Sequence, residues 1–495
     1  MLLWIVIVSG AMSFIASMGI GSNDAANAFA TSVGSKALTL KQACIIAAIF
    51  ETSGAILMGS HVTETIRKGI ADYECFENNP ELLMYGCMWV IFSVGLWLFI
   101  ASYFEMPVST THSCVGGMIG MTIAIAGSDC VIWYKQLDTF PYIGGVGGIV
   151  LSWFISPIFS GIFSSIIFGL TRKFVLRHNY NSNRLNLIYP ILVGTTLTIN
   201  SFFIIYKGAK GLKSDKLPIE MVLYISFSIG IVGGILIMPF VPMIRKIVEN
   251  KFNITALFNN LTVELDEINN NQKDLNILSN NQLTNVINIH NNAERFDPRI
   301  EEMFKYLQIF TASCDSFSHG ANDVANAVGP FAAVYLIYRE NGDIKKKVNM
   351  ENDAYWILGI GGIGIAFGLI IYGKKIIHAI GNKLCKITST RGTCIELGSA
   401  LVIIAGSRLK IPLSTTHCQV GSTIGVGLLE NKSCKNLSNI EGINFYILRK
   451  TAFGWVITCI VVGLTAGLLS AQGIYGPSSS SIATCENSSL IFNIN

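Results

Sequence analysis

The sequence predicts an all-α polytopic membrane protein with about 12 transmembrane segments, some of them re-entrant hairpins. Two observations support this fold class. Charged residues make up 13% of the chain and hydrophobic residues 51%, whereas soluble globular chains carry roughly 25% charged residues. Apolar runs of about 17 to 25 residues recur from end to end, long enough to cross a hydrocarbon core roughly 30 Å thick. We therefore expect spans near residues 2–20, 38–59, 84–104, 142–170, 187–206, 221–244, 304–337, 354–373, 393–408 and 446–470.

The chain divides into four regions. We expect an N-terminal repeat with its connecting spans at 1–244, a polar loop at 245–302, a C-terminal repeat at 303–472 and an exposed tail at 473–495. The loop is rich in asparagine and lacks the apolar content that a packed core needs, so it is predicted to be disordered. Basic residues at its start favour the cytoplasmic side of the membrane. The first apolar segment has no basic residue before it, which predicts a retained helix rather than a cleaved signal peptide.

Two sequence elements occur twice, in the same order. The first pair is Gly21–Ala28 and Pro107–His112, and the second pair is Gly320–Ala327 and Pro412–His417. The copies of the first element lie 299 residues apart, and the copies of the second lie 305 residues apart. A duplication of this length, with polar residues inside apolar stretches, predicts two related halves built around one site. This arrangement is more typical of membrane transporters than of enzymes.

Each copy of the first element places an aspartate beside asparagines in apolar surroundings. An ionised carboxylate at membrane depth costs at least ~2.5 kcal/mol, so it requires a partner or a cation. No lysine or arginine lies within three positions of Asp24 or Asp323. Carboxylate, amide and backbone oxygens are the ligands that a hard cation such as sodium prefers, although capping of a helix start is the structural alternative. The predicted cation-binding residues are Asn23, Asp24, Asn27, Asn322, Asp323 and Asn326.

Each copy of the second element places three hydroxyl residues shortly after a proline, as at the start of a helix. Hydroxyl donors and unpaired backbone N–H groups at such a start form an anion site, although simple N-capping is again the alternative. Two such starts, one from each half, would surround a tetrahedral oxyanion from opposite sides. The stretches 108–127 and 413–429 are therefore expected to belong to re-entrant hairpins. The predicted anion-binding residues are Ser109, Thr110, Thr111, Ser414, Thr415 and Thr416.

The other polar residues of the apolar stretches predict supporting roles. Glu51 and Glu396 are intramembrane carboxylates that either contact ions or close an internal polar network. His112 and His417 are expected to be structural, and no transition-metal site is predicted. The chain is not expected to be an enzyme. Its sequence has no nucleophile elbow, and a Ser–His–Asp hydrolase does not need two copies of each residue. The twelve cysteines show no CxxC pair and are interpreted as small buried apolar residues.

These motifs resemble the inorganic phosphate transporter family, which includes eukaryotic sodium-dependent symporters. The resemblance rests on both duplicated elements, Phe50–Gly54, Thr65–Gly69 and Glu396, and it covers everything except the polar loop and the tail. It implies a multi-pass carrier of the plasma membrane with inverted repeats, which imports phosphate with sodium by alternating access. It implies cation binding by the aspartates and their asparagines, phosphate binding by the hydroxyl residues, and support of transport by both glutamates.

The partners implied by the resemblance are inorganic phosphate, sodium ions and the lipid bilayer, with no cofactor and with a homodimer left open. A net charge of +4 gives no reason to expect nucleic acid. Two alternatives stay open at this point. One keeps the architecture but couples transport to protons or replaces phosphate with sulfate. The other is a membrane receptor or scaffold whose polar loop recruits partners.

Overall fold

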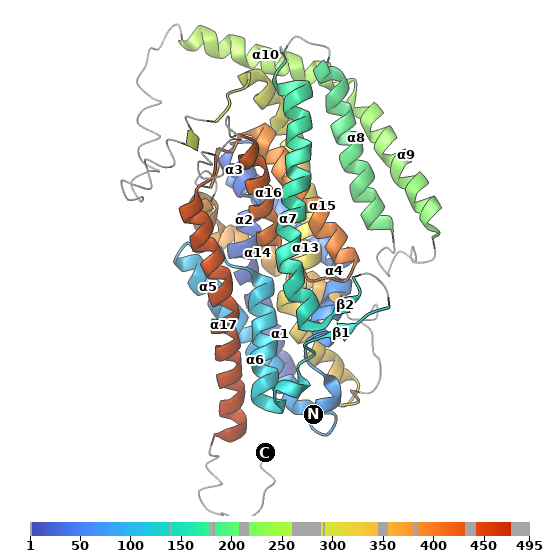
Figure 1. The fold of residues 1–495 in the computed structure, drawn as a ribbon, viewed down its shortest axis with the longest axis vertical. Helices are drawn as coiled ribbons and strands as arrows, with labels where there is room; N and C mark the ends of the chain where they lie inside the picture. Colours follow the sequence, from blue (N-terminus) through green and yellow to red (C-terminus); the bar gives the residue numbers. More distant parts are fainter. Residues whose placement is uncertain are drawn as a thin grey trace, which may run out of the picture.

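The computed structural model describes residues 2–138, 141–178, 180, 184–206, 217–259, 289–290, 293–344, 355–380, 384–430 and 442–476. Apart from two short strands, its regular elements are helices (Figure 1). Eight described helices are long and apolar enough to cross a membrane, so the prediction of a helical membrane protein is confirmed. Residues 260–288, where the polar loop is predicted to be disordered, and the tail from 477 onward lie outside the described residues.

The N-terminal half starts with a broken helix. α1 (Leu3–Ile20) passes through a π-helical turn (Gly21–Ala25) into the short helices α2 (Ala26–Ala28) and α3 (Ala30–Gly34). α4 (Leu40–Lys68) follows, and a capping box of Thr39 and Gln42 fixes its first turn. α5 (Pro80–Tyr103) and α6 (Thr110–Ala126) form the first hairpin. Strands β1 (Lys135–Gln136) and β2 (Ile143–Gly144) pair antiparallel before α7 (Gly145–Thr171).

Three helices lie between the halves. α8 (Arg184–Ile205) packs against α9 (Ile219–Ile237), and α10 (Phe240–Asn259) lies across the upper end of the molecule in Figure 1. The prediction of one span over 221–244 is therefore wrong in extent. The physical reason is Pro242, which cannot continue α9 but is tolerated in the first turn of α10, where its missing N–H is not needed.

The C-terminal half repeats the order of the N-terminal half. It consists of α13 (Pro298–Arg339), α14 (Tyr355–Ile380), the hairpin of α15 (Ser389–Arg408) and α16 (Thr415–Leu429), and α17 (Phe445–Tyr475). The predicted region boundaries at 244/245 and 302/303 fall inside α10 and α13. The hairpin of the N-terminal half lies in the lower part of Figure 1, and that of the C-terminal half lies in the upper part.

The helix contacts of the two halves match. α1 packs against α5 as α13 packs against α15, and α6 packs against α17 as α16 packs against α7. The contacts also cross between the halves, because α4 packs against α13 while α14 packs against α1. The helix that carries each Asp motif is therefore held by the helix that follows the other motif.

Two equivalent glycines allow these crossings. Gly320 of α13 lies against the backbone of Glu51 in α4, and Gly21 lies against the backbone of Ile365 in α14. A Cβ atom on either glycine would overlap the facing carbonyl oxygen. Small residues at helix contacts let backbones approach closely in membranes, where apolar burial drives little association. The first glycine of each repeated Asp motif therefore sets the position of its aspartate.

One disulfide corrects the interpretation of the cysteines. Cys75, in the 3₁₀ turn Tyr73–Phe76, is bonded to Cys130, in the 3₁₀ turn Ser128–Cys130. The two residues are 55 positions apart, so no local spacing motif announces the bond. It joins the segment before α5 to the segment after α6. The open end of the first hairpin is therefore closed covalently.

Candidate functional site

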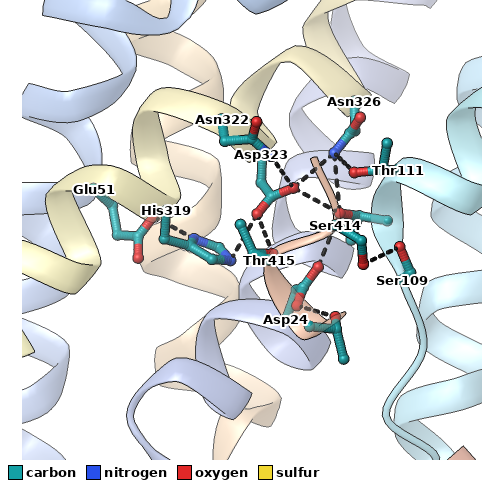
Figure 2. Close-up of polar contacts among 12 residues, drawn as sticks. Asp24, Glu51, Ser109, Thr111, His319, Asn322, Asp323, Asn326, Ser414 and Thr415 are labelled. Carbon is teal, nitrogen blue, oxygen red and sulfur yellow. Dashed lines mark hydrogen bonds and ion pairs between the residues drawn. The ribbon is translucent and has the colours of Figure 1, made fainter. Parts of the chain in front are cut away.

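The two hairpin tips meet each other inside the molecule. α6 begins at Thr110 and α16 begins at Thr415, each directly after a serine that caps the helix. Ser109 accepts a hydrogen bond from the backbone N–H of His112 at 3.3 Å, and Ser414 accepts one from His417 at 3.3 Å. The Ser414 hydroxyl also donates to the Ser109 hydroxyl at 2.9 Å (Figure 2). Two helix N-termini, with their unpaired backbone N–H groups, thus converge on one place.

The first asparagine of each Asp motif holds the hairpin tip of its own half. The Asn23 side chain donates to the Met106 carbonyl at 2.9 Å and accepts from the Val108 N–H at 3.0 Å. The Asn322 side chain donates to the Leu413 carbonyl at 2.8 Å and accepts from the Leu413 N–H at 3.3 Å. Both amides are thus used by backbone groups. In this arrangement they position the hydroxyl residues.

The two predicted aspartates face each other across the hairpin hydroxyls (Figure 2). Asp24 accepts from the Thr416 hydroxyl at 2.6 Å, and Asp323 accepts from the Thr415 hydroxyl at 2.5 Å. The Thr110 hydroxyl lies 2.9 Å from Asp24 Oδ2 and 3.1 Å from Asp323 Oδ1. Its single proton serves only one of these carboxylates at a time. All five side chains are buried.

The site is asymmetric because His319 has no counterpart in the N-terminal half. Its Nδ1 lies 2.8 Å from Glu51 Oε2, and its Nε2 lies 3.1 Å from Asp323 Oδ2. A ring protonated on both nitrogens would compensate one of these carboxylates. Glu51 also accepts from the Ser316 hydroxyl at 3.2 Å. The sequence indicates this histidine only through a difference, since Ile20 stands before the first glycine motif and His319 before the second.

Of the second asparagines of the two motifs, Asn27 and Asn326, only Asn326 has a described side chain. Asn326 donates to Asp323 Oδ1 at 2.8 Å and to the Thr110 and Thr111 hydroxyls at 3.0 and 3.3 Å. Its buried Oδ1 has no hydrogen-bond partner in the described part of the chain. The side chain of Asn27 lies outside the described residues. Asn326 therefore offers an unused oxygen beside the paired aspartates.

Glu396 lies apart from this pair, in a polar network of its own. Its Oε1 accepts from the Thr31 hydroxyl at 2.7 Å, from Ser32, and from the Gln308 amide at 3.1 Å. Its Oε2 accepts from the Thr311 hydroxyl at 2.6 Å. Four neutral donors from α3 and α13 thus surround a fully buried carboxylate. Glu396 thus connects α15 to the helices that carry the two Asp motifs. Of the two roles expected from the sequence, ion contact or closure of an internal polar network, this arrangement corresponds to the second.

A small cavity adjoins Asp24, and its lining contains residues that sequence reasoning missed. Its lining includes Asp24, His319 and Thr415, together with Asp315 and Gln419. Asp315 Oδ1 and both polar atoms of the Gln419 side chain have no hydrogen-bond partner among the described residues. Buried polar atoms without partners are costly and mark places where a ligand or water is expected. The sequence comparison of the two halves does not indicate Asp315 and Gln419, because neither belongs to a repeated motif.

The histidines that follow the hydroxyl triplets pack against tryptophans. The His112 ring stacks on Trp153 with centroids 3.6 Å apart, and its Nδ1 lies 2.7 Å from the Ser109 hydroxyl. His417 Nδ1 lies 2.8 Å from the Trp153 carbonyl, and its ring lies 3.7 Å from Trp455. The candidate metal-ligand group within the described residues is a different one. It consists of Asp24, His319 and Asp323, whose ligand atoms lie within 4.8 Å of one another.

Comparisons with known proteins identify the family of this chain. Residues 20–466 match the model of the phosphate transporter family. A provisionally named phosphate permease of Pyrococcus horikoshii is 33% identical over 469 residues, covering 94% of this chain and 97% of the relative. Sodium-dependent phosphate transporter 1 of Mus musculus is 26% identical over 671 residues, covering 95% of each protein. A solved structure described as the sodium-dependent phosphate transporter superposes with a TM-score of 0.73 at 30% identity, covering 94% of this chain and 98% of that one. This chain is therefore a member of the phosphate transporter family.

Proposed function

We propose that the protein is a sodium:phosphate symporter that works by alternating access. The observation that carries this proposal is the pair of buried aspartates that share one hydroxyl donor. Among the described residues, no lysine or arginine forms an ion pair with Asp24 or Asp323. His319 can compensate at most one negative charge, so two carboxylates at membrane depth that no lysine or arginine pairs with require cations. The 33%-identical archaeal relative is named only as a permease, whereas the mouse relative is named as sodium-dependent.

The hydrogen bonds imply an order of binding. The hydroxyls of Thr110, Thr415 and Thr416 all donate to the aspartates. A hydroxyl has one proton, so it cannot donate to a carboxylate and to an anion together. Sodium ions that neutralise Asp24 and Asp323 would release these hydroxyls for phosphate. Sodium therefore binds before phosphate, and the empty anion site is unfavourable without it.

The candidate phosphate site is the meeting point of the two tips. Its donors are the hydroxyls at Ser109–Thr111 and Ser414–Thr416 and the first N–H groups of α6 and α16. The unused oxygens of Asn326, Asp315 and Gln419 are additional candidate ligands for sodium. In this proposal Asn23 and Asn322 position the tips, and Glu51 and Glu396 support the site. No resident cofactor is proposed.

The matched helix contacts support two halves related as an inverted repeat, with about 12 membrane segments when the hairpin arms are counted. Each hairpin moves against the opposite half and exposes the site to one side at a time. We place the protein in the plasma membrane, as the resemblance implies. A homodimer stays a prediction.

The direct test is uptake of radiolabelled phosphate into vesicles that contain the purified chain. With an inward sodium gradient we expect uptake well above that with an equal potassium gradient. Sulfate in excess should leave this uptake largely unchanged. Equal uptake in sodium and potassium, from folded protein, would contradict sodium coupling.

Proton coupling is the second candidate, and His319 is the observation that favours it. A continuous chain of polar contacts runs from Glu51 through His319 and Asp323 to Thr110 and Asp24. Such a chain could hold and pass a proton. Under proton coupling, acidifying the outside in the absence of sodium should raise uptake.

A His319→Gln variant separates the two mechanisms. Under sodium coupling we expect its uptake to fall several-fold while the requirement for sodium persists, because His319 then only positions Asp323. Under proton coupling the acid-stimulated uptake should disappear. The measurement is phosphate uptake against external pH, with and without sodium. Uptake indifferent to both ions would contradict both candidates.

A further inference from the structure

An open crevice with apolar walls runs along α7 and α15, away from the paired aspartates. Its walls are mostly apolar side chains, and its volume is about 480 Å³. Leu151, Ile155 and Phe159 of α7 form one wall, and Leu401 and Ala405 of α15 form the other. A crevice of this kind between membrane helices is filled by hydrocarbon, since water gains nothing from such walls.

The crevice adjoins a second cavity with a different chemistry. This cavity has a volume of about 350 Å³, and it shares Pro141, Ile143, Gly148, Leu409 and Ile411 with the first. Three lysines line it: Lys68 at the end of α4, Lys135 of β1 and Lys410 of the second hairpin tip. The two cavities therefore adjoin each other, and side by side they offer a space with an apolar part and a basic part.

Two of the three lysines carry the net positive charge of the basic part. Glu64 also lines it, and this carboxylate lies 3.2 Å from Lys68 and 3.0 Å from Arg67. Lys135 and Lys410 are exposed and form no ion pair with any described residue. The basic part therefore favours an anion.

We propose that this space binds an anionic phospholipid. Its phosphate group lies between Lys135 and Lys410, and an acyl chain occupies the crevice between α7 and α15. A free phosphate ion would satisfy the lysines but leave the apolar crevice without an occupant, whereas a phospholipid matches both parts at once. This proposal does not depend on which cation drives transport.

The position of the space gives the lipid access to the second hairpin tip. Leu409, Ile411 and Leu413 of that tip line the crevice. The Leu413 carbonyl accepts from the Thr111 hydroxyl at 2.8 Å and from the Asn322 amide at 2.8 Å. The proposed lipid thus contacts the tip that carries half of the hydroxyl residues.

The test compares two variants of the full chain that affect different parts of the space. Lys135→Gln with Lys410→Gln removes the charge, and Ala405→Phe fills the crevice while the lysines stay. The matched control is Lys173→Gln with Lys450→Gln. Lys173 lies just after α7 and Lys450 lies in α17; both are exposed, and neither lines either cavity. The readouts are lipids retained in native mass spectrometry and titration with fluorescent phosphatidylglycerol against phosphatidylcholine.

We expect the wild-type chain and the control to prefer phosphatidylglycerol, and both test variants to bind it roughly tenfold more weakly or worse. Equal retention by all chains would overturn the proposal. Loss in the lysine variant alone, together with displacement of the probe by inorganic phosphate, would mean a free-phosphate site and would also overturn it. Equal loss in the control would mean non-specific attraction to surface charge and would overturn the proposal as well. If Ala405→Phe does not fold, the exposed lysine pair still decides through the preference between the two lipids.

Discussion

Replacing Asp323 with Asn should lower sodium-driven phosphate uptake roughly 100-fold, which corresponds to about 3 kcal/mol. Asn has the size of Asp but cannot neutralise a cation, and its amide would face the Thr415 hydroxyl, which lies 2.5 Å from Asp323 Oδ2. The neighbouring donors stay in place, so the variant should fold. The measurement is phosphate uptake into vesicles under a sodium gradient, with thermal unfolding of the purified variant to verify its fold.

Asp129→Asn is the matched control for this variant. Asp129 is an acid of the same size in an exposed turn, so its uptake should equal that of the wild-type chain. Asp24→Asn should lose uptake as Asp323→Asn does, because the two carboxylates share the Thr110 hydroxyl. Normal sodium dependence in either Asp variant would remove the cation role from that residue.

Gly320→Ala is expected to destabilise the fold by about 1–3 kcal/mol, the usual cost of inserting a methyl group into a well-packed contact. The added methyl group would overlap the Glu51 carbonyl oxygen, so α13 and α4 would have to separate. Separation would also displace Glu51 from His319, which are 2.8 Å apart. The measurement is thermal unfolding in detergent, and we expect a lower unfolding temperature together with reduced uptake.

Gly359→Ala serves as the control for the glycine variant. A Cβ atom there would meet its nearest neighbour, the tip of Ile56, at 3.7 Å, which is an ordinary contact. Its unfolding temperature should stay near that of the wild-type chain. A Gly320→Ala variant as stable as Gly359→Ala would show that the α4–α13 crossing tolerates more space than its backbone contact indicates.

The sequence predicted the helical membrane fold because hydropathy reports each span locally. The duplication led to the residues that meet at the hairpin tips. Polar residues are costly in an apolar stretch, so a polar motif that occurs there twice indicates a function in both copies. It could not reveal that Asn23 and Asn322 bind backbone groups of the tips. That partnership joins segments about 85 and 91 positions apart and depends on tertiary packing.

Other parts of the site could not be predicted because they break the symmetry of the repeat. Asp315 and Gln419 occur in one half only and outside the repeated motifs, and His319 shows only as a difference from Ile20 beside the first motif. The four donors around Glu396 come from two helices, and no sequence spacing relates them to it. The break at Pro242 was hidden because the apolar run continues through it.

The bond between Cys75 and Cys130 predicts the orientation of the molecule in its membrane. Disulfides persist in oxidising compartments and are rare where glutathione keeps thiols reduced. We therefore expect the face with β1, β2 and the base of the first hairpin to look away from the cytosol, and the face with α10 to look into it. A membrane-impermeant maleimide applied to whole cells should label a cysteine engineered at Asp129 and spare one engineered at Lys173. A single covalent bond thus predicts which face of the membrane each end of the molecule occupies.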